Sequence, residues 1–118
     1  MKSLLLICRQ APRAGVAARE MLDIALAGGA FDLPIAMLFM DDGVLQLCPA
    51  QAPKSLEQKD LQANLNALEM FGVDELYAEA HSLKLRAISQ DGLTLNAAVL
   101  EAADVKALIA RFDQVITL

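Results

Sequence analysis

The sequence has few aromatic side chains and few positive charges. Phe, Trp and Tyr make up 4% of its 118 residues, Trp is absent, and the net charge at pH 7 is −5. Proteins that bind nucleic acid need a basic surface to displace counterions from the phosphates, and many of them stack aromatic rings on the bases. The composition therefore argues against direct binding of nucleic acid.

Long hydrophobic runs are also missing. The longest apolar runs, Leu4–Cys8 and Leu33–Met40, fall far short of the roughly 20 residues that a membrane-spanning helix needs. Lys2 precedes the first run, as in a signal peptide, but Arg9 and Arg13 interrupt that run too soon. We therefore expect a cytoplasmic protein that does not enter a membrane.

Cysteine is scarce as well. The two cysteines, Cys8 and Cys48, show no metal-ligand spacing and suit a reducing compartment. The chain is long enough to bury a core as a single domain, residues 1–118, without a disulfide or metal. Hydrophobic residues nonetheless make up 56% of it, above the roughly 45–50% that is usual. This surplus indicates a permanent oligomer, because obligate interfaces resemble a domain core cut in half.

Five short apolar runs alternate with helical patterns along the chain. The runs are continuous rather than alternating, which is typical of strands covered on both faces in a parallel sheet. The predicted strands are Leu4–Cys8, Ile35–Met40, Leu76–Ala78, Ala97–Leu100 and Val115–Leu118. This order predicts a single small α/β domain with a mostly parallel five-stranded sheet and helices on both faces.

Helical patterns fill the gaps between these strands. Val16–Leu26 is mostly apolar with one narrow polar stripe, and the Gly28–Gly29 pair is expected to end it. A second helix is expected from about Leu56 to Phe71, where leucines share one face. A short helix is predicted at His81–Ile88, and the spacing of apolar residues predicts a last one over Val105–Phe112.

One connection, from Asp41 to Ser55, is unusually long. It follows the second predicted strand and carries the apolar residues Val44, Leu45 and Leu47, whereas compact α/β connections are mostly two to six residues long. Excursions at the carboxyl end of a strand lie where open α/β sheets bind ligands or partners. Because bulky aliphatic side chains in a loop need a cover, these three are predicted to contact a partner. A surface loop with one helical turn is an equally supported alternative.

The charged residues that follow the strands give weak signals for binding sites. Arg9 and Arg13 could hold an anion at the next helix, but the absence of a glycine-rich phosphate loop favours two solvated arginines. Asp41 and Asp42 could hold a metal ion, but one adjacent acidic pair rarely suffices. One of them is instead expected to cap the following turn. His81 lacks a positioned partner for acid–base chemistry, so a place at a helix start or on the surface is favoured for it. No cofactor is expected.

Cys8 and Cys48 are the candidates for carrying sulfur as a persulfide. A sulfur carrier needs an exposed thiolate with a lowered pKa, and Arg9 beside Cys8 would favour one. Free cysteine, however, is often buried as a small hydrophobic residue. Burial is therefore the favoured interpretation for both cysteines.

Several short motifs are spaced along the whole chain. The most specific is Asp-Gly-Val-x-Gln-Leu at residues 42–47, followed by a proline two residues later. Ala-Pro-x-x-Gly at residues 11–15 precedes it, and Ala-x-Ser-Leu at 80–83 and Phe-Asp-x-Val-Ile at 112–116 follow it. Together these motifs resemble the DsrE/DsrF family, and within it the TusC-like (DsrF-like) subunits.

The resemblance implies a flavodoxin-like fold, as in the DsrEFH proteins, and a part in a sulfur relay. In this family TusB, TusC and TusD form a hexamer, a dimer of heterotrimers. The hexamer accepts persulfide sulfur from TusA and passes it to TusE, for 2-thiolation of the wobble uridine in certain tRNAs. In sulfur-oxidising bacteria the similar DsrEFH complex handles sulfur from intracellular stores, and the resemblance fits either route.

In the family the transfer cysteine belongs to the TusD/DsrE-type subunit and begins the helix after the third strand. The corresponding position here is about Glu79, and a carboxylate cannot carry a persulfide. We expect this carboxylate to accept backbone N–H bonds at the helix start, where the helix dipole favours an anion. A plain solvated glutamate is the alternative. The chain is therefore predicted to be a non-catalytic structural and docking subunit, not an enzyme.

Two other interpretations stay open at this point. The chain could itself be a sulfur carrier that uses Cys8 or Cys48. It could also be a stand-alone flavodoxin-like protein that binds a small molecule.

Overall fold

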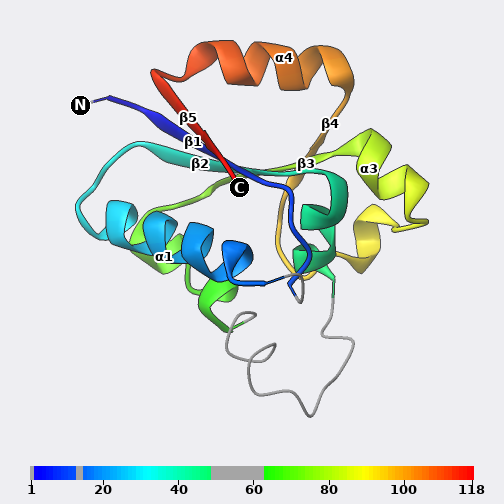
Figure 1. Cartoon of the computed structure of the whole chain (residues 1–118), viewed down its shortest axis with the longest axis horizontal. Helices are drawn as coiled ribbons and strands as arrows, with labels where there is room; N and C mark the ends of the chain where they lie inside the picture. Colours follow the sequence, from blue (N-terminus) through cyan, green and yellow to red (C-terminus); the bar gives the residue numbers. More distant parts are fainter. Residues whose placement is uncertain (1, 13–14, 49–62) are drawn as a thin grey trace.

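Five parallel strands form the centre of the fold, in the order β4-β3-β2-β1-β5 (Figure 1). The computed structural model describes residues 2–12, 15–48 and 63–118. The predicted α/β class is confirmed, and every strand boundary lies within one residue of its predicted place. The strands are β1 (Leu4–Cys8), β2 (Ile35–Phe39), β3 (Glu75–Glu79), β4 (Ala98–Leu100) and β5 (Gln114–Thr117).

Helices cover both faces of the sheet, as predicted (Figure 1). On one face lie α1 (Ala17–Ala30) and the 3₁₀ helix η1 (Asp41–Leu47), and on the other lies α4 (Ala102–Arg111). The connection through α4 starts at β4 on one edge of the sheet and ends at β5 on the other. The remaining short elements are η2 (Glu69–Phe71), α3 (Ala80–Leu85) and η3 (Gln90–Gly92).

The central strands supply side chains alternately to two hydrophobic clusters. Residues of the larger cluster, under α1 and η1, include Leu6, Cys8, Met37 and Phe39. The smaller cluster joins Leu5, Ile7, Ala36 and Leu38 to Val105 and Leu108 of α4. Both faces of β1 and β2 are therefore buried, which explains why their sequences are continuous apolar runs.

The first helix does not end at the Gly28–Gly29 pair, as the sequence led us to expect. α1 continues through both glycines to Ala30. Their lack of a side chain serves packing instead, because a Cβ at Gly28 would collide with Ile35 and one at Gly29 with the carbonyl of Phe71. The pair lets β2 and η2 approach α1 closely, so the prediction of a glycine cap was wrong.

The other helices differ from their predictions mainly in extent. Residues 63–66 are helical and η2 follows them, whereas most of the predicted Leu56–Phe71 helix lies outside the described residues. Gly72 closes this stretch with a φ of 87°, a conformation that glycine adopts without strain. α3 starts one residue before the predicted His81 and ends at Leu85, and Ala87 then turns the chain with a φ of 53°.

Candidate functional site

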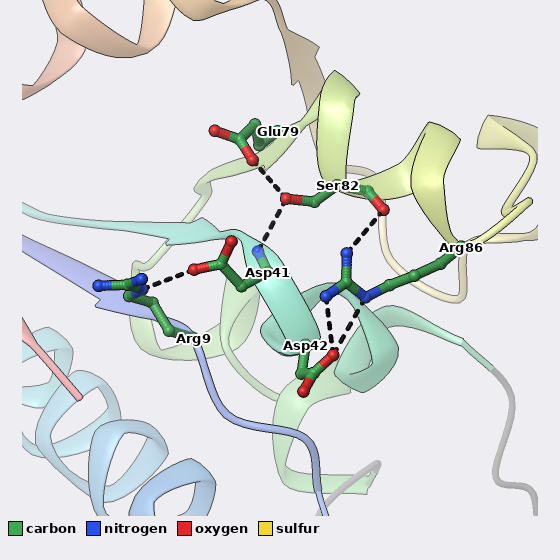
Figure 2. A network of polar contacts seen from close by, with 6 residues as sticks. All are labelled: Arg9, Asp41, Asp42, Glu79, Ser82 and Arg86. Atoms are coloured by element: carbon green, nitrogen blue, oxygen red, sulfur yellow. Dashed lines mark hydrogen bonds and ion pairs between the residues drawn. The ribbon is translucent and has the colours of Figure 1, made fainter.

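The carboxyl ends of β1, β2 and β3 bring together the charged residues that the sequence had singled out separately. Arg9 follows β1, Asp41 follows β2, and Glu79 is the last residue of β3 (Figure 2). Carboxyl ends of parallel strands are where open α/β sheets bind ligands. The carboxyl ends of these strands are therefore the candidate functional site.

Asp41 is held from two sides. Its backbone N–H donates to the Ser82 hydroxyl at 2.8 Å, and its carboxylate accepts from Arg9 Nε at 2.7 Å. Asp41 also has a φ of 51°, which is uncommon for a residue with a side chain and which aspartate tolerates better than most. Because both side chains of the ion pair are about half exposed, at 53% and 42%, the pair contributes at most about 1 kcal/mol.

Asp42 points to a different arginine. Its carboxylate accepts from Arg86 Nη2 at 2.8 Å, and Arg86 Nη1 donates to the Ser82 carbonyl at 3.2 Å. The two aspartates therefore serve two separate ion pairs and do not converge on one cation. Among the described residues no group of three or more His, Cys, Asp or Glu side chains could hold a metal ion.

Neither aspartate caps the turn that follows it, which corrects the sequence-based expectation. The residue at the amino-terminal cap of η1 is Met40, whose side chain makes no capping hydrogen bond. The Asp41 and Asp42 side chains are occupied by Arg9 and Arg86 instead. Arg9 is thus paired within the chain, and Arg13 lies outside the described residues.

Glu79 occupies the amino-terminal cap of α3 but does not cap it. Its carboxylate accepts a hydrogen bond from the Ser82 hydroxyl, three residues on, and no backbone N–H of the helix donates to it. The expectation of backbone N–H bonds to Glu79 was therefore wrong. The partner of the carboxylate is instead the hydroxyl of Ser82, which is buried. His81, between them, is exposed.

Ser82 connects Asp41, Glu79 and Arg86, a role that its sequence context hardly indicates. Its hydroxyl accepts from Asp41 N–H and donates to Glu79, while its carbonyl accepts from Arg86 (Figure 2). A polar residue that is 1% exposed must satisfy its hydrogen bonds inside the protein. The only signal was a serine beside the apolar Leu83 at the start of a helix, and serine is common there.

Cys8 ends β1 inside the larger hydrophobic cluster. It is 1% exposed, and burial raises the pKa of its thiol to about 12. Gly43 lies against its carbonyl so closely that a Cβ at residue 43 would overlap it. The favoured prediction of a buried cysteine is confirmed, and at neutral pH this thiol stays protonated and shielded.

Cys48 follows η1 and is half-buried. Its Sγ lies 3.9 Å from the carbonyl oxygen of Val44, and burial raises the pKa of its thiol as well. A raised pKa reduces the thiolate fraction, and the thiolate is the nucleophilic form. Cys48 is therefore the more accessible of the two thiols, but it is not an activated one.

The apolar residues of η1 do not form a surface patch. Val44 and Leu47 are fully buried in the chain's own core, and only Leu45 is partly exposed. The prediction that all three contact a partner was wrong for Val44 and Leu47, because η1 folds back against the sheet and covers them. Leu45 stays a candidate for such a contact. The rest of the predicted long segment, residues 49–55, lies outside the described residues.

Gln46 is a second buried polar residue that sequence reasoning passed over. Its Nε2 donates to the carbonyl of Gln10 at 3.0 Å, which ties the loop after β1 to η1. Its Oε1 is buried and has no hydrogen-bond partner among the described residues. The motif at residues 42–47 thus owes its glycine and glutamine to the packing of η1 against the end of β1.

Comparisons with known proteins agree on the family. The profile of the DsrE/DsrF-like family matches residues 2–118. A protein of Pseudomonas aeruginosa named "Protein TusC homolog" is 59% identical over 117 residues, which cover 99% of this chain and 98% of that protein. The "Intracellular sulfur oxidation protein DsrF" of Allochromatium vinosum is 34% identical over 93 residues, or 79% of this chain and 68% of that protein.

A solved structure confirms the fold independently of close sequence similarity. The crystal structure of the YchN protein from E. coli superposes with a TM-score of 0.79 and covers both chains completely, at 18% identity. Within the described residues, none of the helices combines the length and the apolar character needed to cross a membrane.

Proposed function

The chain belongs to the DsrE/DsrF-like family, and from this premise we propose that it is a non-catalytic subunit of a cytoplasmic sulfur-relay complex. The complex contains TusB- and TusD-like sister subunits in a heterohexamer. It takes persulfide sulfur from TusA and delivers it to TusE for 2-thiolation of the tRNA wobble uridine. This chain supplies structure and docking surface, and the transfer cysteine belongs to the TusD-like sister.

One observation carries the non-catalytic assignment. By the family resemblance the transfer cysteine of the sister begins the helix after its third strand, and in this chain Glu79 stands between β3 and α3. The Glu79 carboxylate is engaged by the Ser82 hydroxyl, so this position is part of a structural hydrogen-bond network. A carboxylate offers no sulfur atom to an incoming persulfide.

The state of the two cysteines supports the same proposal. Cys8 is sealed in the core, and its pKa of about 12 leaves almost no thiolate near pH 7. Cys48 remains the competing candidate, because it is partly accessible. If the chain were a sulfur carrier, its persulfide would form on Cys48.

The tRNA route is favoured over a sulfur-oxidation route by the comparisons. The TusC homologue of P. aeruginosa is 59% identical and matches over almost its entire length. The A. vinosum DsrF protein is 34% identical and is covered to 68%. A DsrF-like part in a sulfur-oxidation complex is therefore the second candidate.

Reconstituted transfer tests the proposal. The complex is assembled from this chain and its TusB- and TusD-like sisters, given persulfide-loaded TusA, and assayed for sulfur on TusE. With Cys8→Ala and Cys48→Ala combined, we expect transfer near the wild-type rate, because neither thiol takes part. Replacing the transfer cysteine of the TusD-like subunit by serine is the control that should abolish transfer.

The cysteine that carries sulfur can be read directly in the same experiment. Alkylation and mass spectrometry of the loaded complex should place the persulfide on the TusD-like sister. A persulfide on Cys48, or a large loss of transfer in the double variant with the hexamer intact, would mean that this chain is itself a carrier.

A further inference from the structure

Among the described residues, Phe31 and Met70 have the most exposed large apolar side chains, and both come shortly before the amino end of a strand, opposite the charged network. Phe31 is 78% exposed and Met70 88% exposed, with Leu33 and Phe71 beside them in the sequence at 37% and 44%. Phe31 and Leu33 follow the end of α1, and Met70 and Phe71 belong to η2. We call these four residues the apolar corner.

The two halves of the apolar corner are fixed against each other. Gly29 lets the Phe71 carbonyl pack directly on α1, at a distance that no larger residue would permit. The Phe31 and Leu33 N–H groups donate to the Gly28 carbonyl, and the Phe71 N–H donates to the carbonyls of Ala67 and Leu68. The corner is therefore built on hydrogen-bonded turns. Single exposed apolar residues are ordinary, but a fixed group of four marks a contact surface.

Acidic residues stand next to the corner in the sequence and in the cavity beside it. Asp32 lies between Phe31 and Leu33, and Glu69 precedes Met70. A shallow cavity next to η2 is lined by the carboxylates Glu69 and Asp74 and by the amides Asn66 and Asn96, over Leu65 and Leu76. The described residues 20–48 and 63–83 contain no lysine or arginine, and Arg111, which comes from α4, is paired with Glu75 at 2.9 Å.

We propose that the apolar corner and this acidic cavity form one docking surface for a protein partner that presents apolar side chains beside a lysine or arginine. The apolar side chains of the partner pack on Phe31 and Met70, and its cation enters the cavity between Glu69 and Asp74. Aromatic and methionine side chains are enriched at the centres of interfaces. The partner's charge follows from complementarity, since like charges across an interface cost free energy.

A second copy of this chain is a poor occupant of the same surface. In a symmetric dimer both copies use the same surface, so Glu69 and Asp74 of both would be gathered in one interface without a lysine or arginine from residues 20–48 or 63–83 to pair with them. The inference rests on the proposed function, because it names the surface through which the subunit docks to a sister in the complex.

The test compares variants in the assembled complex. Phe31→Ser combined with Met70→Ser should weaken association with the co-expressed TusB- and TusD-like subunits roughly tenfold or more, because two anchors are lost. Leu85→Ser is the matched control, since Leu85 is apolar and 69% exposed but lies on α3. It should assemble normally. Glu69→Gln with Asp74→Asn should weaken association at low salt and much less at high salt.

Each alternative has its own signature in these measurements. Wild-type affinity of the Phe31/Met70 double variant overturns the inference while the proposed function stands, whereas a wild-type chain that never joins the sisters overturns both. A fall of several degrees in the melting temperature of the isolated double variant would mean that the chain covers the corner with residues of its own. Self-association of the isolated chain that the double variant abolishes would identify a second copy as occupant. Either result contradicts the inference.

Discussion

The Ser82 hydroxyl connects two segments that are 41 residues apart in the sequence. It accepts the Asp41 N–H and donates to Glu79, so one oxygen fixes the start of η1 against the start of α3. Both segments follow strands at the same edge of the sheet. The position of η1, which carries the half-buried Cys48, therefore depends on this serine.

Removing this hydroxyl should destabilise the protein measurably. Ser82→Ala leaves the Asp41 N–H without its acceptor in a partly buried place, and we expect a loss of about 1–3 kcal/mol in the free energy of unfolding. Glu79→Gln is the matched control, since an amide oxygen still accepts from Ser82, and it should cost much less. Urea unfolding measures both, and equal losses in the two variants would contradict this account.

For single residues, the sequence predicted the features that depend on local pattern. It did not predict the contacts that depend on residues far away in the chain. Cys8 could be predicted as buried because it ends a continuous apolar strand. The hydrogen bonds of Ser82 could not be predicted, because they depend on which loops meet at the carboxyl ends of the strands. The burial of Val44 and Leu47 was missed for the same reason, since nothing in η1 itself shows that it folds back.

The element η1 packs closely against the end of β1 because it has a glycine, Gly43, at the point of contact. The chain leaves β2 and turns across the end of β1, where Met40 N–H donates to the Cys8 carbonyl at 3.0 Å. Gly43 lies on that same carbonyl, and a Cβ there would overlap backbone atoms of Cys8 and Arg9. Backbone atoms cannot move aside as a flexible side chain can.

Gly43→Ala should therefore be among the most damaging single substitutions in this protein. We expect a loss of about 2–4 kcal/mol, in the range of severe overpacking, measured by thermal or urea unfolding. Gly92→Ala is the matched control, because no atom lies within 4 Å of a Cβ at residue 92. It should change stability by no more than about 1 kcal/mol, with either sign. Similar losses at both glycines would show that the close approach is not the cause.

Elements were predicted well where periodicity decides and less well where packing does. Strand positions followed from short apolar runs, which a sheet covered on both faces requires. The end of α1 did not follow from local pattern, because Gly28 and Gly29 look like a helix stop but serve the contacts with Ile35 and Phe71. A glycine that ends a helix and a glycine that allows close packing look alike in the sequence, and only the tertiary neighbours distinguish the two roles.

Over the whole molecule, the first and last strands are fastened side by side. β5 pairs with β1, and Ser3 and Asp113 clasp each other at the start of both strands. The Asp113 carboxylate accepts from the Ser3 N–H at 2.8 Å and from its hydroxyl at 3.1 Å. These two bonds hold the pKa of Asp113 below its usual range, with the backbone N–H as the larger cause.

This clasp should make stability depend on pH in the acid range. Because the folded-state pKa is lowered, the stabilisation is fully present above the unfolded-state pKa and is lost as pH falls through the folded-state pKa. Asp113→Asn should therefore melt below wild type at neutral pH, and the difference should shrink on acidification. Ser3→Ala keeps the backbone donor and should lose only part of the effect. A difference in melting temperature that is constant from pH 7 to pH 2 would contradict this assignment.

The place of β5 beside β1 also fixes the order in which the sheet can be completed during synthesis. β1 pairs with β2 on one side and with β5 on the other, so its second neighbour is the last of these five strands to be made. At typical elongation rates the roughly 110 residues between them take on the order of ten seconds to emerge. Throughout that time Leu4–Cys8 is an edge strand with one side open, and an open apolar edge invites pairing with other chains. The nascent protein thus keeps an apolar strand open on one side until β5 has been made.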